Sequence, residues 1–364
     1  MTTKELYEIF YNLGIDFYTG VPDKKLAGFL ESASESQSTP FFTKDKQSTY
    51  RKNNIQVVPA ACEANAVSIA AGYYIATGNC PVVYMSNTGF WSSIGSLFHL
   101  ADSDAFATPM LVTMVLDKEK QGAYNKKNAL LTKTVIEDAH YPYCHLTTTS
   151  DFKAEIAHAI EMANEFKKPC FVLINEDALQ RDHKYVDKKF SSLAKQDVIK
   201  YITSVLADTD FVVSSAGNIS HEIYAAREAN GQSHSNDLLV NGAFGQASSV
   251  AYGIALNTNK NVYCIDGDGA FLRDLGGLTT AVQNTQRNLK YILIDDGSYS
   301  TSGGTKTPIQ CLDTKKMLKS MGMKNTIEAY SIEDIKVGML RLAKEKSVLI
   351  VKVYDNKCFG KDFA

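Results

Sequence analysis

The sequence predicts an α/β protein built from two doubly wound domains, each with a parallel sheet. Short, nearly continuous apolar runs recur along the chain, and stretches with helical spacing of apolar residues lie between them. Such runs are typical of strands buried on both faces of a parallel sheet. Their alternation with helices favours the doubly wound arrangement. The length of 364 residues suits two domains, since domains usually contain about 100–200 residues.

Eight apolar runs are predicted to be strands, four in each half of the chain: residues 16–21, 81–87, 109–116 and 170–175, then 211–217, 261–269, 291–298 and 348–355. Apolar residues at helical spacing predict helices between them, most clearly at residues 4–15, 63–78, 153–166 and 334–345.

Polar stretches divide the chain. A charged segment at residues 178–195 is predicted to be a linker, which gives a first domain of residues 1–177 and a second of residues 196–364. Two further polar stretches, residues 33–54 and 117–128, are predicted to be long surface loops.

The composition excludes several function classes. With 21% charged residues and a formal net charge of -2, the chain has no bias towards polyanions, so a nucleic acid is not expected as a partner. No apolar run approaches the roughly 18 residues of a membrane span, and we expect neither export nor membrane insertion. The seven cysteines are scattered without a close pair, which suits reduced thiols and a cytoplasmic location.

The strongest chemical signal lies at the ends of two predicted strands. The sequence IDGDGAF includes Gly267, Asp268 and Gly269, and IDDGSYSTSGG follows the next strand with Asp296. The glycines let the backbone turn sharply and approach a ligand. Carboxyl ends of neighbouring parallel strands meet at one edge of a sheet, where ligands of such folds bind. Two hard carboxylates at that edge, together with a diphosphate, suit Mg²⁺.

These two segments resemble the thiamine-diphosphate enzymes, whose signature is GDG followed by an Asn at a later strand end. The resemblance implies thiamine diphosphate and Mg²⁺ as cofactors, with the metal bound by Asp268, Asp296 and the backbone carbonyl of Ser298. Asp296 stands where the family usually has Asn. It keeps an oxygen ligand but adds a negative charge near the diphosphate. Because Asp and Asn differ little in shape, Asp296→Asn is predicted to be geometrically mild.

The segment VVPAACEANAVSIAAGYYIATG resembles the phosphonopyruvate decarboxylases more specifically, since their usual sequence at this place is close to ANEGNAxxxAxGYxxxTG. This resemblance implies that Glu63 is the activating carboxylate, which protonates N1' of the cofactor's pyrimidine. A Glu at a helix start is otherwise a common surface residue that interacts with the helix dipole.

Three more segments extend the resemblance over nearly the whole chain: residues 20–26, 84–89 and 241–256. By this resemblance Asn87 and Gly242 bind the cofactor, and Phe244 props it into a bent shape; the alternative for Phe244 is a core residue. Asp23 is the candidate that relays a proton to the product, and the alternative is a loop cap.

Gly217 and Asn218, which follow the strand at 211–217, resemble the turn that contacts the diphosphate; the alternative is a plain helix cap. The family's Arg-containing GWRGEPG segment is missing here, and residues 117–128 contain lysines instead. These lysines are candidates for binding an anionic substrate, although a solvated loop is the simpler interpretation. Lys306 is the stronger candidate because it follows the metal-ligand loop.

The resemblance implies a carboxy-lyase in which residues 1–177 bind the pyrimidine and residues 196–364 bind the diphosphate and Mg²⁺. The expected reaction is the non-oxidative decarboxylation of a short 2-oxo acid with an anionic tail, phosphonopyruvate being the first choice. Sulfopyruvate decarboxylase, a carboligase and an inactive cofactor-binding regulatory subunit are the alternatives. Active sites of the family form between subunits, so we expect a homodimer or a higher homo-oligomer.

Overall fold

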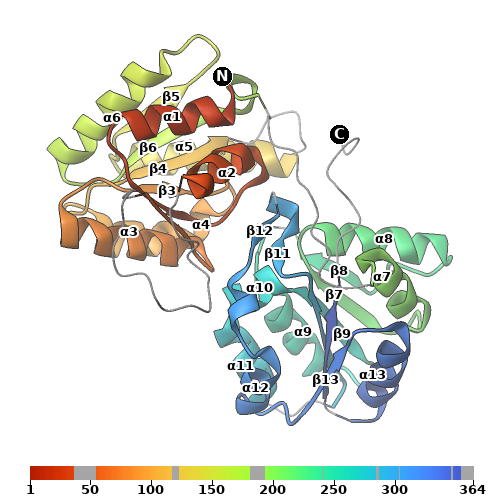
Figure 1. Ribbon diagram of the computed structural model, residues 1–364. Coiled ribbons are helices and arrows are strands. Elements are labelled where there is room, and N and C mark those ends of the chain that lie inside the picture. The colour runs from red at the N-terminus through yellow and green to blue at the C-terminus, as the bar shows by residue number, and fades with distance from the viewer. Residues whose placement is uncertain are drawn as a thin grey trace. The chain divides into compact units, whose positions relative to one another are not determined.

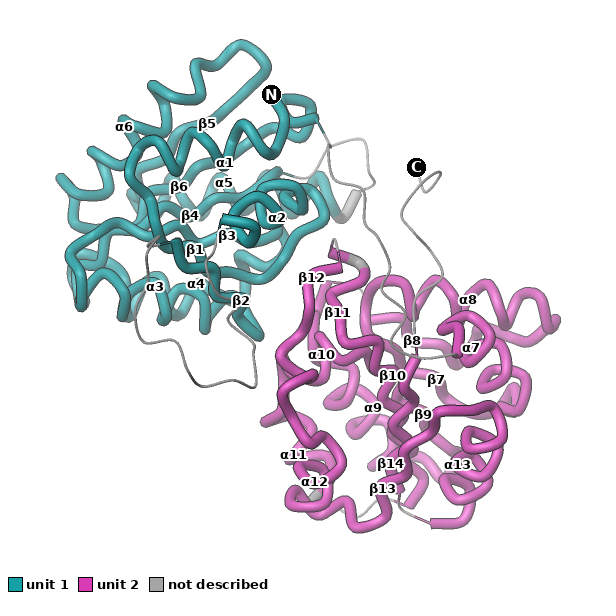
Figure 2. Tube along the Cα trace, viewed as in Figure 1, with its two compact units in different colours: residues 1–184, 362–364 teal, residues 185–361 magenta. Residues whose placement is uncertain are grey.

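The computed structural model describes residues 1–36, 55–116, 123–180, 193–240, 242–283, 287–302, 304–345 and 347–353 (Figure 1). The described chain forms two compact units, one within residues 1–184 and one within residues 185–361 (Figure 2). The division falls inside the predicted linker, of which residues 181–192 lie outside the described residues. Helix α7 begins at Lys195, the last residue of that segment.

The first unit is a six-stranded sheet in which every neighbouring pair is parallel. Its strands, in sheet order, are β2 (Gln56–Pro59), β1 (Phe17–Gly20), β3 (Val82–Tyr84), β4 (Leu111–Leu116), β6 (Cys170–Asn175) and β5 (Tyr143–Leu146). Its helices are α1 (Thr3–Asn12), α2 (Ala27–Glu35), α3 (Glu63–Thr77), α4 (Phe90–Ser96), α5 (Ala123–Asp138) and α6 (Phe152–Phe166), with the short helices η1 (Lys24–Leu26), η2 (Leu97–Ala101) and η3 (Glu176–Ala178).

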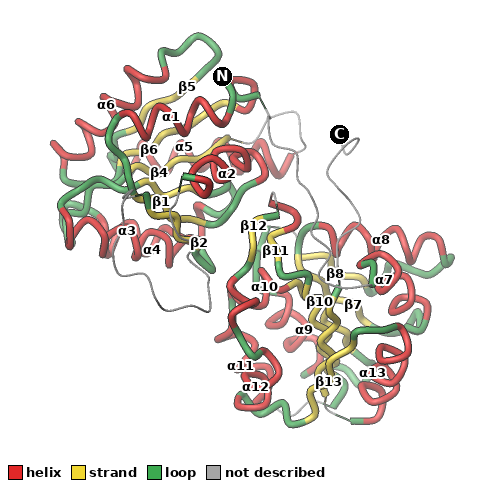
Figure 3. The backbone as a smooth tube through the Cα atoms, in the orientation of Figure 1, coloured by secondary structure: helices red, strands yellow, loops and turns green. Residues whose placement is uncertain are grey.

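Helices cover both faces of this sheet (Figure 3). Apolar residues of α1, α2 and α6 form one core with Tyr18, Val82 and other strand residues, whereas α3, α4 and α5 pack with Val83 and its neighbours on the opposite face. The side chains alternate because successive strand residues point to opposite faces. This two-sided burial explains why the inner strands read as continuous apolar runs.

The second unit repeats this architecture with a sheet whose neighbouring strands are also all parallel. In sheet order the strands are β13 (Asn325–Ala329), β14 (Ser347–Lys352), β10 (Leu289–Asp295), β9 (Val262–Gly267), β7 (Phe211–Ser215) and β8 (Asp237–Val240). The helices are α7 (Lys195–Ser204), α8 (Asn218–Ala229), α9 (Ala247–Ala255), α10 (Asp268–Arg273), α11 (Leu275–Gln283), α12 (Thr314–Ser320) and α13 (Ile332–Lys344).

Helices α7, α8 and α13 share one core of the second unit, and helices α9, α10, α11 and α12 share the other. A small antiparallel ribbon, β11 (Ser298–Tyr299) with β12 (Thr305–Lys306), follows β10. The short helix η4 (Ser300–Ser302) lies between the two strands of the ribbon, and η5 (Pro308–Cys311) follows β12. The predicted fold class, α/β with two doubly wound parallel sheets, is confirmed.

Two predicted loops are partly wrong. Helix α2 continues to Glu35, so residues 33–35 are helical, and residues 37–54 lie outside the described residues. Helix α5 begins at Ala123, so residues 123–128 are its first turns, while residues 117–122 lie outside the described residues. Polar residues also occur in the terminal turns of helices, so polarity alone does not distinguish a helix end from a loop.

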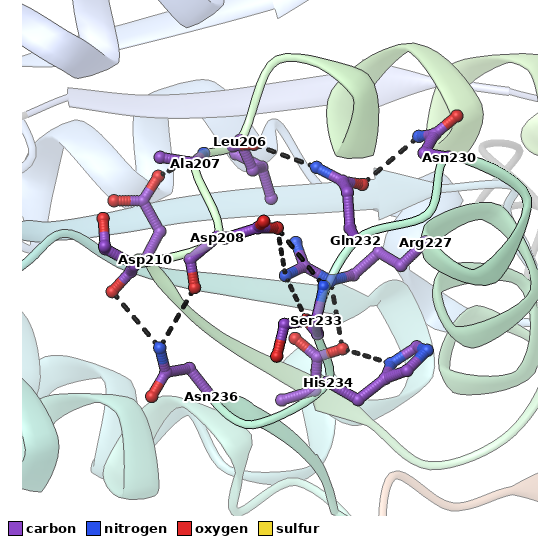
Figure 4. A network of polar contacts seen from close by, with 12 residues as sticks. Leu206, Ala207, Asp208, Asp210, Arg227, Asn230, Gln232, Ser233, His234 and Asn236 are labelled. Atoms are coloured by element: carbon purple, nitrogen blue, oxygen red, sulfur yellow. Dashed lines mark hydrogen bonds and ion pairs between the residues drawn. The ribbon is translucent and has the colours of Figure 1, made fainter.

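A polar network fixes the connection between α8 and β8 (Figure 4). The fully buried Arg227 donates from Nη2 to the carbonyl of Ser233 at 2.7 Å, and its Nε lies 3.1 Å from Oδ2 of Asp237. Nδ1 of His234 lies 2.7 Å from the same carboxylate oxygen. Asp237 is the first residue of β8, so the network anchors the amino end of this edge strand.

Among the described residues, all six cysteines are free thiols: Cys62, Cys80, Cys144, Cys170, Cys264 and Cys311. None of the described helices is both long and apolar enough to cross a bilayer.

Candidate active site

The strand order of the second unit places its candidate residues at a topological switch point. From β7 the chain leads to β8 on one side and, later, to β9 on the other. The connections that leave β7 and β9 therefore diverge, and ligands of such folds bind at the carboxyl ends of strands at a switch point of this kind. Gly217 and Asn218 follow β7, and Asp268 follows β9. These sequence-predicted residues thus come from both sides of one switch point.

The turn after β7 requires glycine. Gly217 has φ 105° and ψ -149°, a conformation that L side chains rarely adopt. It is the N-cap of α8 and offers no side chain to cap the helix, and Asn218 is the first helical residue. The backbone N–H groups at this helix start suit an anion. The turn is tied to β9, because the Gly267 N–H donates to Oγ of Ser215 at 3.2 Å.

Asp268 is the first residue of α10 and is buried. Its Oδ1 accepts from the backbone N–H of Gly269 at 2.9 Å, and its Oδ2 accepts from Oγ1 of Thr307 at 2.6 Å. Burial raises the pKa of this carboxyl well above its usual range, and the negative charges of Asp296 and Asp295 raise the pKa further. The three carboxylates lie at the ends of the adjacent strands β9 and β10, and a cation between them would relieve their repulsion.

The next strand end contributes two more carboxylates. Asp296 accepts at Oδ1 from the N–H and the Oγ of Ser298, both at 2.9 Å, and its Oδ2 lies 3.1 Å from Nζ of Lys195. Asp295 accepts from the Gly297 N–H at 3.1 Å and forms an ion pair with Lys352. Each of the two adjacent acids thus has its own lysine.

The donor set fits Mg²⁺ bound together with a diphosphate. Asp268 and Asp296 would provide carboxylate oxygens from neighbouring strand ends, and Ser298 would add a backbone carbonyl. Within the described part of the chain, no group of three or more His, Cys, Asp or Glu side chains could hold a metal on its own. An octahedral ion at this position would need further oxygens, which a diphosphate offers.

A glycine-rich turn carries Phe244. Gly242 and Gly245 have φ 82° and 84°, so both positions favour glycine; Asn241 lies outside the described residues. Phe244 is 37% exposed, so it does not lie in the core of the second unit, and the guanidinium carbon of Arg273 lies 5.5 Å from its ring centroid. Its role at the cofactor stays a prediction.

Gly269 is needed for close packing. A Cβ added at this position would lie 3.0 Å from the ring of Tyr299, a residue of the loop that follows β10. A side chain at Gly269 would therefore push against this ring, and the start of α10 lies close to β11 without strain because Gly269 has none.

Lys306 lies beside the segment that carries Asp296 and Ser298. In the β11–β12 ribbon it is the direct partner of Ser298, and its side chain is exposed. The following residue, Thr307, is buried and connects back to the loop, because its N–H donates to the Gly297 carbonyl at 3.0 Å. Of the other candidate lysines, Lys126 and Lys127 lie in α5 of the first unit, whereas Lys118 and Lys120 lie outside the described residues.

In the first unit, Glu63 is the first residue of α3 and is buried. Its Oε2 accepts from Oγ of Ser92 at 2.7 Å. Its other oxygen lies against Gly89: a Cβ added there would be only 2.0 Å from Oε1. The carboxylate is therefore held by a serine on one side, and on the other it lies where a side chain at Gly89 would displace it.

The loop after β3 adds a second signal. Asn87 is buried, and neither its amide oxygen nor its amide nitrogen has a hydrogen-bond partner among the described residues. Burying an amide without hydrogen-bond partners costs free energy, so the Asn87 side chain indicates that a bound molecule supplies the partners. The loop itself is fixed to α5, because Asn128 donates to Oγ1 of Thr88 at 3.2 Å and accepts from the indole of Trp91.

Asp23 follows β1, which lies between β2 and β3 at the switch point of the first sheet. It is buried, and its Oδ1 accepts from the N–H of Lys25 at 3.2 Å, which caps η1. This contact agrees with the loop-cap alternative, and a role in proton transfer stays a prediction.

Sequence reasoning missed four residues of these sites: Ser92, Lys195, Thr307 and Lys352. None lies in a recognisable motif, and each reaches its acidic partner from another element of the fold. Lys195 is separated from Asp296 by 101 positions, and Lys352 from Asp295 by 57. A pattern of local spacing has no means to detect such pairs.

Residues 215–353 match the family described as thiamine pyrophosphate enzyme, C-terminal TPP binding domain. The matched segment begins at the end of β7 and ends just after β14. It contains all the second-unit residues discussed above except Lys195.

The proteins that are similar to the chain include decarboxylases from archaea and bacteria. The sulfopyruvate decarboxylase subunit beta of Methanocaldococcus jannaschii is 30% identical over 167 residues, which cover 44% of this chain and 86% of that protein. The sulfopyruvate decarboxylase of Methanosarcina acetivorans is 23% identical, covering 91% of this chain and 85% of its own. The phosphonopyruvate decarboxylase of Streptomyces viridochromogenes is also 23% identical, covering 89% and 80%. The similarity therefore extends through both units.

Proposed function

The chain belongs to the thiamine pyrophosphate enzymes, and from this premise we propose that it is a thiamine-diphosphate- and Mg²⁺-dependent decarboxylase of a short 2-oxo acid with an anionic tail. Our first choice of substrate is phosphonopyruvate, which would give phosphonoacetaldehyde and carbon dioxide. The observation that carries the proposal is the group of buried acids at the carboxyl ends of β9 and β10, beside the N-terminus of α8.

The chemistry of decarboxylation explains why the cofactor is needed. When bound, thiamine diphosphate supplies a thiazolium that accepts the electron pair left behind by departing carbon dioxide. Direct decarboxylation of a 2-oxo acid has no comparable electron sink. The protein's own part is to bind the cofactor, fix its shape and supply or remove protons.

In the second unit, the proposed task is to hold the diphosphate and the metal. Gly217 and Asn218 would present backbone N–H groups to the diphosphate, and Asp268, Asp296 and the Ser298 carbonyl would bind Mg²⁺.

Four further residues of this unit would shape the cofactor site: Gly242, Phe244, Gly267 and Gly269. The glycines allow close approach of the backbone, and the exposed ring of Phe244 would support the bent cofactor.

In the first unit, the proposed task is proton transfer. Glu63 would exchange a proton with N1' of the pyrimidine, with Ser92 and Gly89 fixing the position of its carboxylate. The unpaired amide of Asn87 would hydrogen-bond to the bound cofactor. Asp23, which is buried after β1 at the switch point of the first sheet, would deliver the proton that the product needs.

The substrate's tail is proposed to meet Lys306, because an exposed ammonium beside the metal-ligand loop suits a dianion. Sulfopyruvate is the second candidate, since its sulfonate also presents tetrahedral oxygens and the relatives named for the two substrates are equally similar over most of the chain. A carboligase, which differs only in the fate of the decarboxylated adduct, and an inactive regulatory subunit are the further alternatives.

We also propose that the active form is a homodimer or a higher homo-oligomer, with sites completed between subunits. Helices α3, α4 and α5 of the first unit carry exposed large apolar side chains, which suit an interface: Ile69, Trp91, Leu130 and Leu131. Sedimentation analysis of the purified protein would measure the assembly, and a monomer at micromolar concentration with full activity would contradict this part.

A substrate panel tests the proposed function. Phosphonopyruvate, sulfopyruvate, pyruvate and a larger 2-oxo acid would be incubated with enzyme, thiamine diphosphate and Mg²⁺, and carbon dioxide release would be measured. We expect turnover of an anionic-tailed substrate to exceed that of pyruvate. The absence of carbon dioxide release from every substrate, with the cofactor bound, would favour the regulatory subunit instead.

A further inference from the structure

Lys195 is a buried lysine whose position opposes two physical preferences. The residue is 1% exposed, and it is the first residue of α7. Burial disfavours an ammonium group, and the partial positive charge at a helix N-terminus repels it. A lysine at such a position needs a strong anionic partner.

That partner is Asp296. Nζ of Lys195 lies 3.1 Å from Oδ2 of Asp296 and 3.1 Å from Oγ of Ser300. The side chains of Lys195 and Asp296 are both buried. The contact uses Oδ2, whereas Oδ1 accepts from Ser298. Lys195 and Ser298 therefore contact different oxygens of the Asp296 carboxylate.

The ion pair of Lys195 and Asp296 contributes to the charge balance of the site. Three buried carboxylates, those of Asp268, Asp295 and Asp296, lie at the ends of two adjacent strands. Lys352 offsets Asp295 and Lys195 offsets Asp296, so one net negative charge is left for a divalent cation to bind. Without the lysines, three carboxylates would repel any diphosphate placed beside them.

We propose that Lys195 is the fixed counter-ion of Asp296 and that, through this ion pair, it sets the charge of the site so that diphosphate and Mg²⁺ bind together. The inference rests on the proposed function and deepens it. Lys195 is a positioning residue, because it acts through Asp296. It also lies outside residues 215–353, so the matched family segment does not include it.

The test is a double-mutant cycle with Lys195→Met and Asp296→Asn. Met removes the ammonium but keeps a long side chain, and Asn removes the carboxylate's charge but keeps its shape. Calorimetry on the full-length protein at saturating Mg²⁺ would measure the dissociation constant of thiamine diphosphate. We expect Lys195→Met to weaken this binding at least tenfold, about 1.4 kcal/mol, because the uncompensated carboxylate repels the diphosphate.

The double variant distinguishes charge balance from a general loss of structure. Because it removes both charges, we expect its affinity for thiamine diphosphate to return to within about threefold of wild type. Lys352→Met is the matched control: it leaves the same net charge on the site but breaks the ion pair of Asp295, which is not a proposed metal ligand. Because the pairing with Asp296 is what the inference invokes, Lys352→Met should weaken binding less than Lys195→Met does.

Each outcome decides the inference. Unchanged binding by Lys195→Met, or a double variant as weak as Lys195→Met, would overturn it while leaving the proposed function intact. If the wild-type protein itself did not bind thiamine diphosphate, the proposed function would fail as well, and the two failures are thereby distinguishable.

Discussion

Gly89→Ala is expected to disable the proposed activating carboxylate without touching any reacting group. The added Cβ would lie 2.0 Å from Oε1 and 2.5 Å from Cδ of Glu63, far inside contact distance. Gly89 has φ -68° and ψ -24°, which any residue adopts, so the substitution acts through space and not through backbone strain. The Glu63 carboxylate must move by about 1 Å to restore an allowed contact.

A displacement of about 1 Å in a positioned catalytic group costs on the order of 100-fold in rate. We therefore expect carbon dioxide release by Gly89→Ala to fall by roughly that factor. Overpacking of a buried position should cost about 1–3 kcal/mol in stability, whereas affinity for thiamine diphosphate should change little. The measurements are turnover, thermal unfolding and the rate of deuterium exchange at the cofactor's C2.

Gly95→Ala is the matched control, because Gly95 lies in α4, the helix that Gly89 precedes as N-cap, and a Cβ there would meet no atom within 4 Å. This variant should keep wild-type turnover and be slightly stabilised, as alanine is a better helix former. If Gly89→Ala also kept turnover within about threefold of wild type, the position assigned to the Glu63 carboxylate would be wrong.

Three further changes test other parts of the site. Glu63→Gln should retain the fold and cofactor binding but lower turnover at least ~100-fold; near-normal turnover would remove the proposed proton transfer. Lys306→Ala should impair an anionic-tailed substrate more than pyruvate, as seen in kcat/KM; equal losses would point to a cofactor or folding role. Thr307→Val removes the donor to Oδ2 of Asp268 and should cost about 1–3 kcal/mol of stability in urea unfolding; an unchanged unfolding curve would show that this hydrogen bond contributes nothing.

The strands that could be predicted from the sequence are the inner ones. All eight predicted strands are inner strands of the two parallel sheets, and the four strands of these sheets that were missed, β2, β5, β8 and β13, are their four edges. Inner strands are buried on both faces and therefore show continuous apolar runs. Edge strands such as YCHL and NTIEA are partly exposed, so polar residues interrupt the signal. A continuous apolar run indicates burial on both faces of a sheet, and edge strands are not buried in that way.

The candidate site divides in a similar way. Residues next to strand ends, such as Asp268 and Glu63, could be named because the local sequence resembles a family. Ser92, Thr307 and the two lysines could not, because their roles depend on which distant elements the fold brings together. The unpaired amide of Asn87 is visible only in three dimensions as well, since its burial and its missing partners are properties of the packed loop.

The ion pair of Asp296 changes what its replacement should do. By shape alone, Asp296→Asn is a mild substitution, but in the structure it leaves the ammonium of Lys195 buried with its charged partner removed. Breaking a buried ion pair from one side costs about 3–5 kcal/mol, so we expect the cofactor-free Asp296→Asn protein to be destabilised by about 3 kcal/mol in urea unfolding. Combining it with Lys195→Met should recover most of that loss, because the remaining pair is neutral. A single variant that unfolds within about 1 kcal/mol of wild type would mean that Lys195 finds another partner or loses its proton, and the carboxylate of Asp296 would then be there for the metal alone.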